Sequence, residues 1–220
     1  MMKKVISALF AVFSLVFSGA AMAETNFGVS AQIVSLEASG TETEGGEKNS
    51  KDVSHVFPVG SVFAEIAGER FTVGLDWIPV DADVSSKTHK RTDTESSVTG
   101  TAAEVSTSRT QTAQAEIQNH ITLYGEMTLG DTPYYAKAGY IHVTVDAQES
   151  LGTGSKYGSA DINGVLIGAG LRTGNLKYEV TYTDYDDVSL TSSVARTGVS
   201  TNNKVTADLD ATAFKISYVF

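Results

Sequence analysis

The sequence contains no cysteine and only three prolines among its 220 residues. Without cysteine, neither disulfide bonds nor thiolate metal sites can form. The scarcity of proline leaves long strands uninterrupted, because proline cannot donate a hydrogen bond to a β-ladder. Beyond residue 23 we find no apolar run that approaches the ~20 residues of a membrane helix. These absences exclude a disulfide scaffold, a zinc–cysteine site and a helical membrane span in that part of the chain.

Basic residues are also in short supply. Lys and Arg number 16 against 26 Asp and Glu, which gives a formal net charge of −10. Phosphate contacts require Lys and Arg, so we predict no nucleic-acid partner. The four histidines, at positions 55, 89, 120 and 142, are dispersed and form no HExxH motif. We therefore predict that the protein is not an enzyme, and we predict no cofactor.

The first 23 residues have the pattern of a secretory signal. Lys3 and Lys4 precede an apolar stretch over 5–17, and Ala21-Met22-Ala23 is a small-x-small cleavage site. An N-terminal anchor helix is the alternative. Cleavage would leave 14 basic and 26 acidic residues, a net charge of −12, on a mature chain of 24–220. A chain of that length is expected to form one domain.

The remainder of the chain predicts eight strands, each long enough for the ~9–11 tilted residues that cross a bilayer. They cover 26–37, 54–66, 70–81, 113–129, 134–147, 161–173, 176–188 and 206–220. The connections alternate in length. Short ones are 67–69, 130–133 and 174–175, and long ones are 38–53, 82–112, 148–160 and 189–205. Short turns on one side and long loops on the other are typical of outer-membrane barrels.

Side-chain parity supports closure around a polar interior. In the last strand Phe214, Ile216, Tyr218 and Phe220 share one face, and the opposite face is mixed. An apolar outer face and a polar inner face suit lipid. Ile117 is assigned to the outer face of its strand. Two strands are less regular, since 55–66 carries apolar residues on both parities and 134–145 changes parity, which predicts a bulge.

Eight charged residues are candidates for the barrel interior. Five have the inward parity of the regular strands, Asp76 joins them if Phe71, Val73, Leu75 and Trp77 face lipid, and Glu65 and Lys137 join under one choice of register. Most of them lie within a few positions of the short turns. An eight-stranded barrel is only just wide enough to be filled by its own side chains, so four acids and four bases should pair. Two interpretations remain, a structural plug and a gated pore. The residues are Glu65, Asp76, Glu126, Lys137, Arg172, Lys177, Glu179 and Lys215.

Two further features predict contacts at the outer surface. Asp184, Asp186, Asp208 and Asp210 continue the outward parity of the last two strands, either as a solvated rim or as a divalent-cation site that bridges lipopolysaccharide phosphates. The segment 82–111 holds thirteen Ser or Thr residues and no aromatic residue. It is expected to be mobile or to extend its hairpin into water, as a spacer or as a recognition loop.

The cleavage site, the strand layout, the segment from Pro133 to Tyr140 and the terminal Tyr218-Val219-Phe220 together resemble the small eight-stranded bacterial outer-membrane β-barrels. These include the OmpA transmembrane domain, the OmpX-like proteins and the opacity-type porin superfamily. The resemblance implies an all-β, antiparallel, up-and-down transmembrane barrel in the outer membrane. It also implies that Tyr218 and Phe220 act as an assembly signal for the barrel-assembly machinery.

The same resemblance implies a structural or surface-interaction role in adhesion or envelope integrity, with a narrow channel for small solutes as the alternative. The expected partners are outer-membrane lipid and lipopolysaccharide, and a host, phage or surface ligand that binds through loops 38–53 and 82–112. The barrel is expected to be monomeric, because closure leaves no strand edge to pair.

Overall fold

The computed structural model describes residues 24–44, 47–85, 88–97, 105–150, 156–193 and 201–220. The predicted signal sequence lies outside this part of the chain. The described residues contain no helix that is long and apolar enough to cross a membrane. The strands are β1 (Glu24–Glu44), β2 (Glu47–Ala67), β3 (Phe71–Trp77), β4 (Ala82–Asp83), β5 (His89–Ser97), β6 (Val105–Thr128), β7 (Tyr134–Ser150), β8 (Ser159–Thr173), β9 (Leu176–Tyr185), β10 (Val188–Thr191) and β11 (Lys204–Val219).

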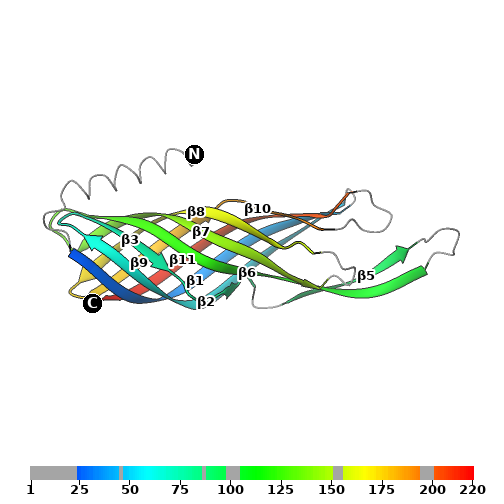
Figure 1. Ribbon diagram of the computed structural model, residues 1–220, viewed down its shortest axis with the longest axis horizontal. Coiled ribbons are helices and arrows are strands. Elements are labelled where there is room, and N and C mark those ends of the chain that lie inside the picture. Colours follow the sequence, from blue (N-terminus) through cyan, green and yellow to red (C-terminus); the bar gives the residue numbers. More distant parts are fainter. Residues whose placement is uncertain (1–23, 45–46, 86–87, 98–104, 151–155, 194–200) are drawn as a thin grey trace.

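The strands form one antiparallel sheet that closes on itself. Neighbours run β1-β2-β3-β6-β7-β8-β9-β11, and β1 also pairs with β11 from Gly28↔Val219 to Thr43↔Lys204. The short strands β4 and β5 continue the course of β3 along β6, and β10 continues that of β9 along β11. Figure 1 shows the resulting ring of tilted strands. The prediction of an antiparallel barrel with eight strand positions is confirmed.

The two ends of the barrel differ in their connections. Short turns join β2 to β3, β6 to β7 and β8 to β9 at one end, which we call the turn end. At the opposite, hairpin end, β1 and β2 remain paired as far as Glu44↔Glu47. Likewise β5 pairs with β6 from His89↔Ala113 to Ser97↔Val105. The β5–β6 ribbon projects beyond the rest of the sheet (Figure 1).

The prediction that 38–53 forms a loop is therefore wrong, because most of this segment belongs to β1 and β2. Most of 82–112, which was also predicted as a loop, is strand as well. A continued ladder satisfies the backbone groups of these segments. Thr residues, which are frequent there, also favour the pleated conformation. The alternative in which 82–111 extends its hairpin is the one that the structure bears out.

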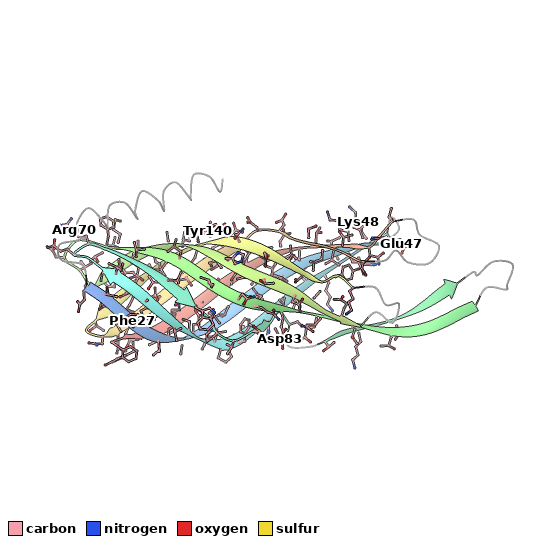
Figure 2. The ribbon with its side chains drawn as sticks, in the orientation of Figure 1. Phe27, Glu47, Lys48, Arg70, Asp83 and Tyr140 are labelled. Carbon is pink, nitrogen blue, oxygen red and sulfur yellow. The ribbon has the colours of Figure 1, made fainter. Side chains whose placement is uncertain are left out.

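Large apolar side chains cover the outside of the barrel towards the turn end. Phe27 is 61% exposed, Ile167 62% and Phe220 69%. In Figure 2 Phe27 lies near the turn end, and Lys48 lies at the hairpin end. An exposed apolar surface of this extent suits contact with lipid rather than with water. We call this surface the apolar belt: Phe27, Val29, Ile33, Val56, Val62, Ile66, Leu75, Trp77, Val80, Ile121, Leu123, Met127, Leu129, Tyr134, Ile167, Val180, Tyr182, Phe214, Ile216, Tyr218 and Phe220.

The predicted parity change in 134–145 does not occur. Tyr135, Lys137, Ile141 and Val145 all face the interior and are all buried. The inward-facing side chains of β7 are charged near the turn end and apolar towards the hairpin end. In β2 the inward-facing side chains also become apolar towards the hairpin end, which explains why this strand carries apolar residues on both parities.

The predicted bulge in 134–145 is wrong, because the bulge occurs in another strand. It lies in β6, where the register with β7 shifts between Gln118 and Ile121 and where Asn119 has a φ of 53°. A bulge inserts an extra residue and so reverses the faces on its far side. Ile117 is consequently buried in the interior, with 7% of its surface exposed, and not on the outer face as predicted.

Among the described strands, the ladder around the wall is interrupted at two positions. One lies between β8 and β10, because the β8–β9 ladder ends at Gly164↔Tyr185 and β10 pairs with β11 and not with β8. The other lies beside β2. The β2–β3 ladder covers six residue pairs and ends at Val62↔Trp77. Beyond that pair, β4 pairs with β6 and not with β2, so within the described residues β2 has a ladder partner only in β1. A side-chain contact bridges the two sides again where Nδ1 of His55 lies 3.1 Å from the carbonyl oxygen of Asp83. The expectation that closure pairs every edge is therefore wrong at this position.

Candidate functional site

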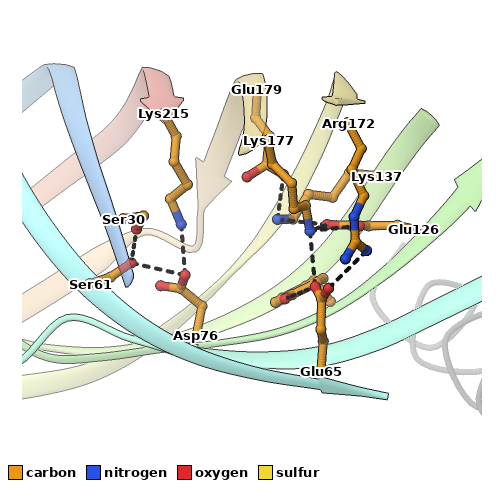
Figure 3. A network of polar contacts seen from close by, with 11 residues as sticks. Ser30, Ser61, Glu65, Asp76, Glu126, Lys137, Arg172, Lys177, Glu179 and Lys215 are labelled. Atoms are coloured by element: carbon orange, nitrogen blue, oxygen red, sulfur yellow. Dashed lines mark hydrogen bonds and ion pairs between the residues drawn. The ribbon is translucent and has the colours of Figure 1, made fainter. Parts of the chain in front are cut away.

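Charged side chains fill the interior near the turn end. Strand alternation points them inward, and their positions close to the short turns bring them to one level. The cluster comes from five strands, and Figure 3 shows its side chains turned towards one another. Its members are Glu65 on β2, Glu126 on β6, Lys137 on β7, Arg172 on β8, and Lys177 and Glu179 on β9.

Lys177 lies at the centre of this cluster. Its Nζ is 2.7 Å from Oε1 of Glu126 and 3.0 Å from Oε2 of Glu65, and 2% of its side chain is exposed. Lys137 Nζ donates to Glu179 at 2.6 Å and lies 3.3 Å from Glu126. Each buried ammonium thus meets two carboxylates, which is the arrangement that buried charge requires.

Aromatic rings and one arginine complete the cluster. The Tyr124 hydroxyl donates to Glu65 at 3.1 Å, and Lys137 Nζ stands 3.8 Å from the centre of the Tyr124 ring. Lys177 Nζ lies within 5.6 Å of the Phe63, Tyr124 and Tyr135 rings. At the turn end Arg172 contacts Glu65 at 3.3 Å while 37% of its side chain is exposed. Arg172 therefore caps the cluster towards solvent.

A second, smaller group lies beside the first. Lys215 Nζ donates to Oδ2 of Asp76 at 2.7 Å, and the Ser61 hydroxyl donates to the same oxygen at 2.9 Å. Ser30 forms a hydrogen bond with Ser61. The structure thus places all eight predicted charges in the interior, divided between these two groups. Parity did not identify the partner of each charge or the roles of Tyr124, Ser30 and Ser61.

The Lys215–Asp76 pair supplies a test of whether this interior is dry. Lys215→Met should lower the free energy of unfolding by about 3 kcal/mol, because it leaves a buried carboxylate without its cation. Adding Asp76→Asn should recover part of that loss, since the neutral amide can still pair with Ser61. Urea unfolding of the two single variants and the double variant measures the coupling. Strictly additive changes below about 0.5 kcal/mol would indicate hydrated, independent charges.

Apolar side chains fill the interior on the hairpin side of the charges. Tyr157 packs against this core and its hydroxyl donates to Glu42 at 2.9 Å, which covers the core from the hairpin end. This apolar layer was not predicted, because the interior was expected to be polar along its whole length. The buried cluster consists of Leu36, Val84, Ile117, Ile141, Val143, Val145, Ile162, Tyr185, Val188, Leu190, Leu209 and Ala211.

A cavity of about 70 Å³ lies where the charged and apolar layers meet. Most of its wall is apolar, with contributions from Phe57, Val59 and Ala213. His120 also lines it, and Nε2 of this ring is 3.2 Å from the Tyr185 hydroxyl. Its Nδ1 is buried and has no hydrogen-bond partner among the residues that the structure describes.

The four rim aspartates do not converge on one point. Asp184 and Asp210 are cross-strand neighbours, and Tyr182 donates to Asp210 at 2.6 Å. Asp208 lies instead beside Asp187, and a hydrogen bond with Asp187 together with its charge raises the pKa of Asp208. In the part of the chain that the structure describes, no group of three or more acidic or histidine side chains is placed to hold a metal ion. A divalent-cation site at this rim stays a prediction.

The terminal aromatic residues lie on the outer face as predicted. The rings of Tyr218 and Phe220 meet edge to face with centroids 5.4 Å apart, and the backbone N–H of Phe220 donates to Phe27 at 2.8 Å. This contact joins the last strand to the first at the turn end. Recognition of these residues by the assembly machinery stays a prediction.

Comparison with known proteins tests the fold. No protein-family model matches the chain, and neither does any curated protein sequence. Among solved structures, the outer-membrane protein AlkL in lipid bilayers matches with a TM-score of 0.50 and 12% identity, over 90% of each chain. The chain has an outer-membrane β-barrel fold. The resemblance to small outer-membrane barrels is thus confirmed as a likeness of fold.

Two further barrels match at lower scores. The attachment invasion protein Ail of Yersinia pestis gives a TM-score of 0.31 at 12% identity, with 86% of this chain and 98% of Ail covered. A FadL homologue of Pseudomonas aeruginosa gives 0.33 at 7% identity, over 89% of this chain and 90% of that one. We draw no functional argument from either.

Proposed function

We propose that the protein resides in the bacterial outer membrane as a barrel closed to ions, and that it acts through its outer surface in adhesion or envelope integrity. Its direct partners would be outer-membrane lipid and lipopolysaccharide, after insertion by the barrel-assembly machinery. No catalytic role forms part of this proposal. The observation that carries it is the filled interior, in which balanced charges close the turn end and an apolar core lies above them.

The paired charges support a plug rather than a conducting pore. A hydrated channel needs water around its charges, whereas Glu65, Lys177 and Glu179 are each at most 2% exposed. Above them Ile141 and Val143 are fully buried, so the apolar layer offers no polar path either. The narrow-channel alternative has no comparable observation in its favour.

The hairpin end supports a role at the cell surface. The β1–β2 hairpin and the β5–β6 ribbon extend past the apolar belt, where they would reach a host, phage or surface ligand (Figure 1). Backbone ladders pair the strands of both segments. Exposed segments on a rigid scaffold are common sites of recognition.

Conductance in planar bilayers tests the proposal. The unaltered protein should give no steady current, because its ion pairs block the turn end. Replacing Lys177, Glu126 and Glu65 by Ser together with Ile141 and Val143 by Ser should produce channel openings, because both the charged and the apolar closure are then removed. Heat-modifiable migration in gels checks that both proteins are folded. A steady, ion-selective current through the unaltered protein would overturn the plug and support the channel.

A further inference from the structure

A row of cross-strand neighbours marks the border of the apolar belt towards the hairpin end. Trp77 of β3 pairs with Ile121 of β6. Along the same row Ile121 pairs with His142 of β7, and His142 pairs with Asn163 of β8. Tyr140 lies on the outer face of β7 one step closer to the turn end, and Figure 2 shows it between the two ends of the barrel. Because tryptophan and tyrosine are typical of the level at which a barrel leaves the hydrocarbon, residues beyond this row would face lipid headgroups.

The β6 bulge brings two consecutive amide side chains to the outer face just beyond this row. Asn119, with its φ of 53°, is the only residue other than glycine with a positive φ in the described part of the chain. Its Nδ2 atom lies 3.4 Å from Oγ1 of Thr144, and Nε2 of Gln118 donates to Glu116 at 3.2 Å. Bulges re-aim side chains and are frequent beside functional sites, so this position invites a functional explanation.

Hydrogen bonds join these amides to the two neighbouring strands. The Thr144 hydroxyl donates to Asp161 of β8 at 2.8 Å, and Nδ1 of His142 lies 3.1 Å from Oδ1 of Asn163. Amide and carboxylate groups keep further donor or acceptor positions after these bonds. The result is an ordered outer surface that can still bind a ligand. We call it the polar patch: Gln118, Asn119, His142, Thr144, Asp161 and Asn163.

The charge of the polar patch favours hydroxyl groups over phosphate. The patch contains no Lys or Arg, and its one carboxylate, Asp161, is joined by that of Glu116 through the bond with Gln118. A phosphate group would meet these carboxylates without a cationic side chain of the patch to pair with. A sugar hydroxyl can donate to a carboxylate and accept from an amide, so it suits both kinds of group.

We propose that the polar patch binds the sugar of a glycolipid whose acyl chains lie against the apolar belt. The sugar hydroxyls pair with Asp161 and with the amides of Asn119 and Asn163, while Trp77 and Tyr140 border the sugar on the side of the belt. Because the patch is continuous with the belt, its ligand is a lipid-linked sugar and not a soluble saccharide. This inference rests on the proposed outer-membrane location, and it names the sugar as the part of lipopolysaccharide that this wall contacts.

Two lipids separate recognition of sugar from recognition of phosphate. The protein is placed in phosphatidylcholine vesicles with EDTA, and the emission of Trp77, the only tryptophan, reports occupancy. Monogalactosyl diacylglycerol carries a sugar without phosphate and should change the emission along a saturating curve. Phosphatidic acid carries phosphate without a sugar and should leave the emission unchanged. Soluble methyl galactoside should act several-fold more weakly than the galactolipid, and an equally strong effect would refute the lipid-linked source.

A matched pair of double substitutions locates the binding site. Asp161→Ala with Asn163→Ala should raise the half-saturating fraction of galactolipid several-fold. Asp210→Ala with Thr212→Ala removes polar groups from the outer face of β11, away from the patch, and should leave that fraction unchanged. Equal effects of the two double variants, or equal responses to the two lipids, would overturn the inference. The comparison of lipids on the unaltered protein decides the matter even if the patch variant fails to fold.

The outcome is separate from that of the conductance experiment. A barrel that conducts and still responds to the galactolipid would overturn the proposed closure and support the sugar site. A barrel that is closed and responds to neither lipid would overturn the sugar site alone.

Discussion

Lys177→Met is expected to lower the free energy of unfolding by about 3–5 kcal/mol. The substitution leaves Glu65 and Glu126, both buried, without the ammonium group that lies between them. The loss should exceed that of Lys215→Met, because Lys215 contacts a single carboxylate and is more exposed. Urea unfolding in detergent measures it, with the fluorescence of Trp77, the only tryptophan, as the signal.

Lys48→Met is the matched control. Lys48 is exposed at the hairpin end, so its replacement should alter the free energy of unfolding by less than about 0.5 kcal/mol. Combining Lys177→Met with Glu126→Gln should cost less than the sum of the two single changes, because the pair is coupled. If Lys177→Met cost no more than Lys48→Met, water would have to solvate the cluster and the plug would be untenable.

Gly74→Ala is expected to destabilise the barrel by about 3 kcal/mol through overpacking. A Cβ atom at Gly74 would collide with the Tyr124 ring. This ring cannot move freely, because Tyr124 is only 1% exposed and its hydroxyl donates to Glu65. The ammonium group of Lys137 also lies against the face of the ring. The substitution should therefore disturb the charge cluster as well as the local packing. The same urea titration measures the change.

Gly60→Ala controls for the general effect of replacing glycine in a strand. Gly60 faces outward on β2, and a Cβ there would meet only the Ser30 carbonyl oxygen at an ordinary 3.6 Å. It should be neutral or slightly stabilising, since alanine restricts the unfolded chain. Adding Tyr124→Leu to Gly74→Ala should relieve the collision. Equal effects of the two glycine substitutions would refute the role of the Tyr124 contact.

The sequence by itself determined the barrel, its short turns and the side of the wall on which most residues lie. The reason is that successive side chains of a strand point to opposite faces, so the sequence of one strand is enough to show which residues share a face. Glu126, Lys177 and Glu179 could be assigned to the interior on this basis alone. The terminal Phe220 was assigned to the lipid face by the same rule.

Only the tertiary structure decided which charges meet and where the ladder around the barrel is interrupted. Lys177 and Glu65 are 112 positions apart and Lys215 and Asp76 are 139 apart, so their pairing depends on closure of the ring. The bulge at Asn119 moved Ile117 inside, which local alternation could not foresee. The interruption of the β2 ladder likewise arises because β4 pairs with β6 and not with β2. Strand pairing depends on which segments, distant in the sequence, come together in the folded barrel, and the residue pattern within one segment does not determine its partner.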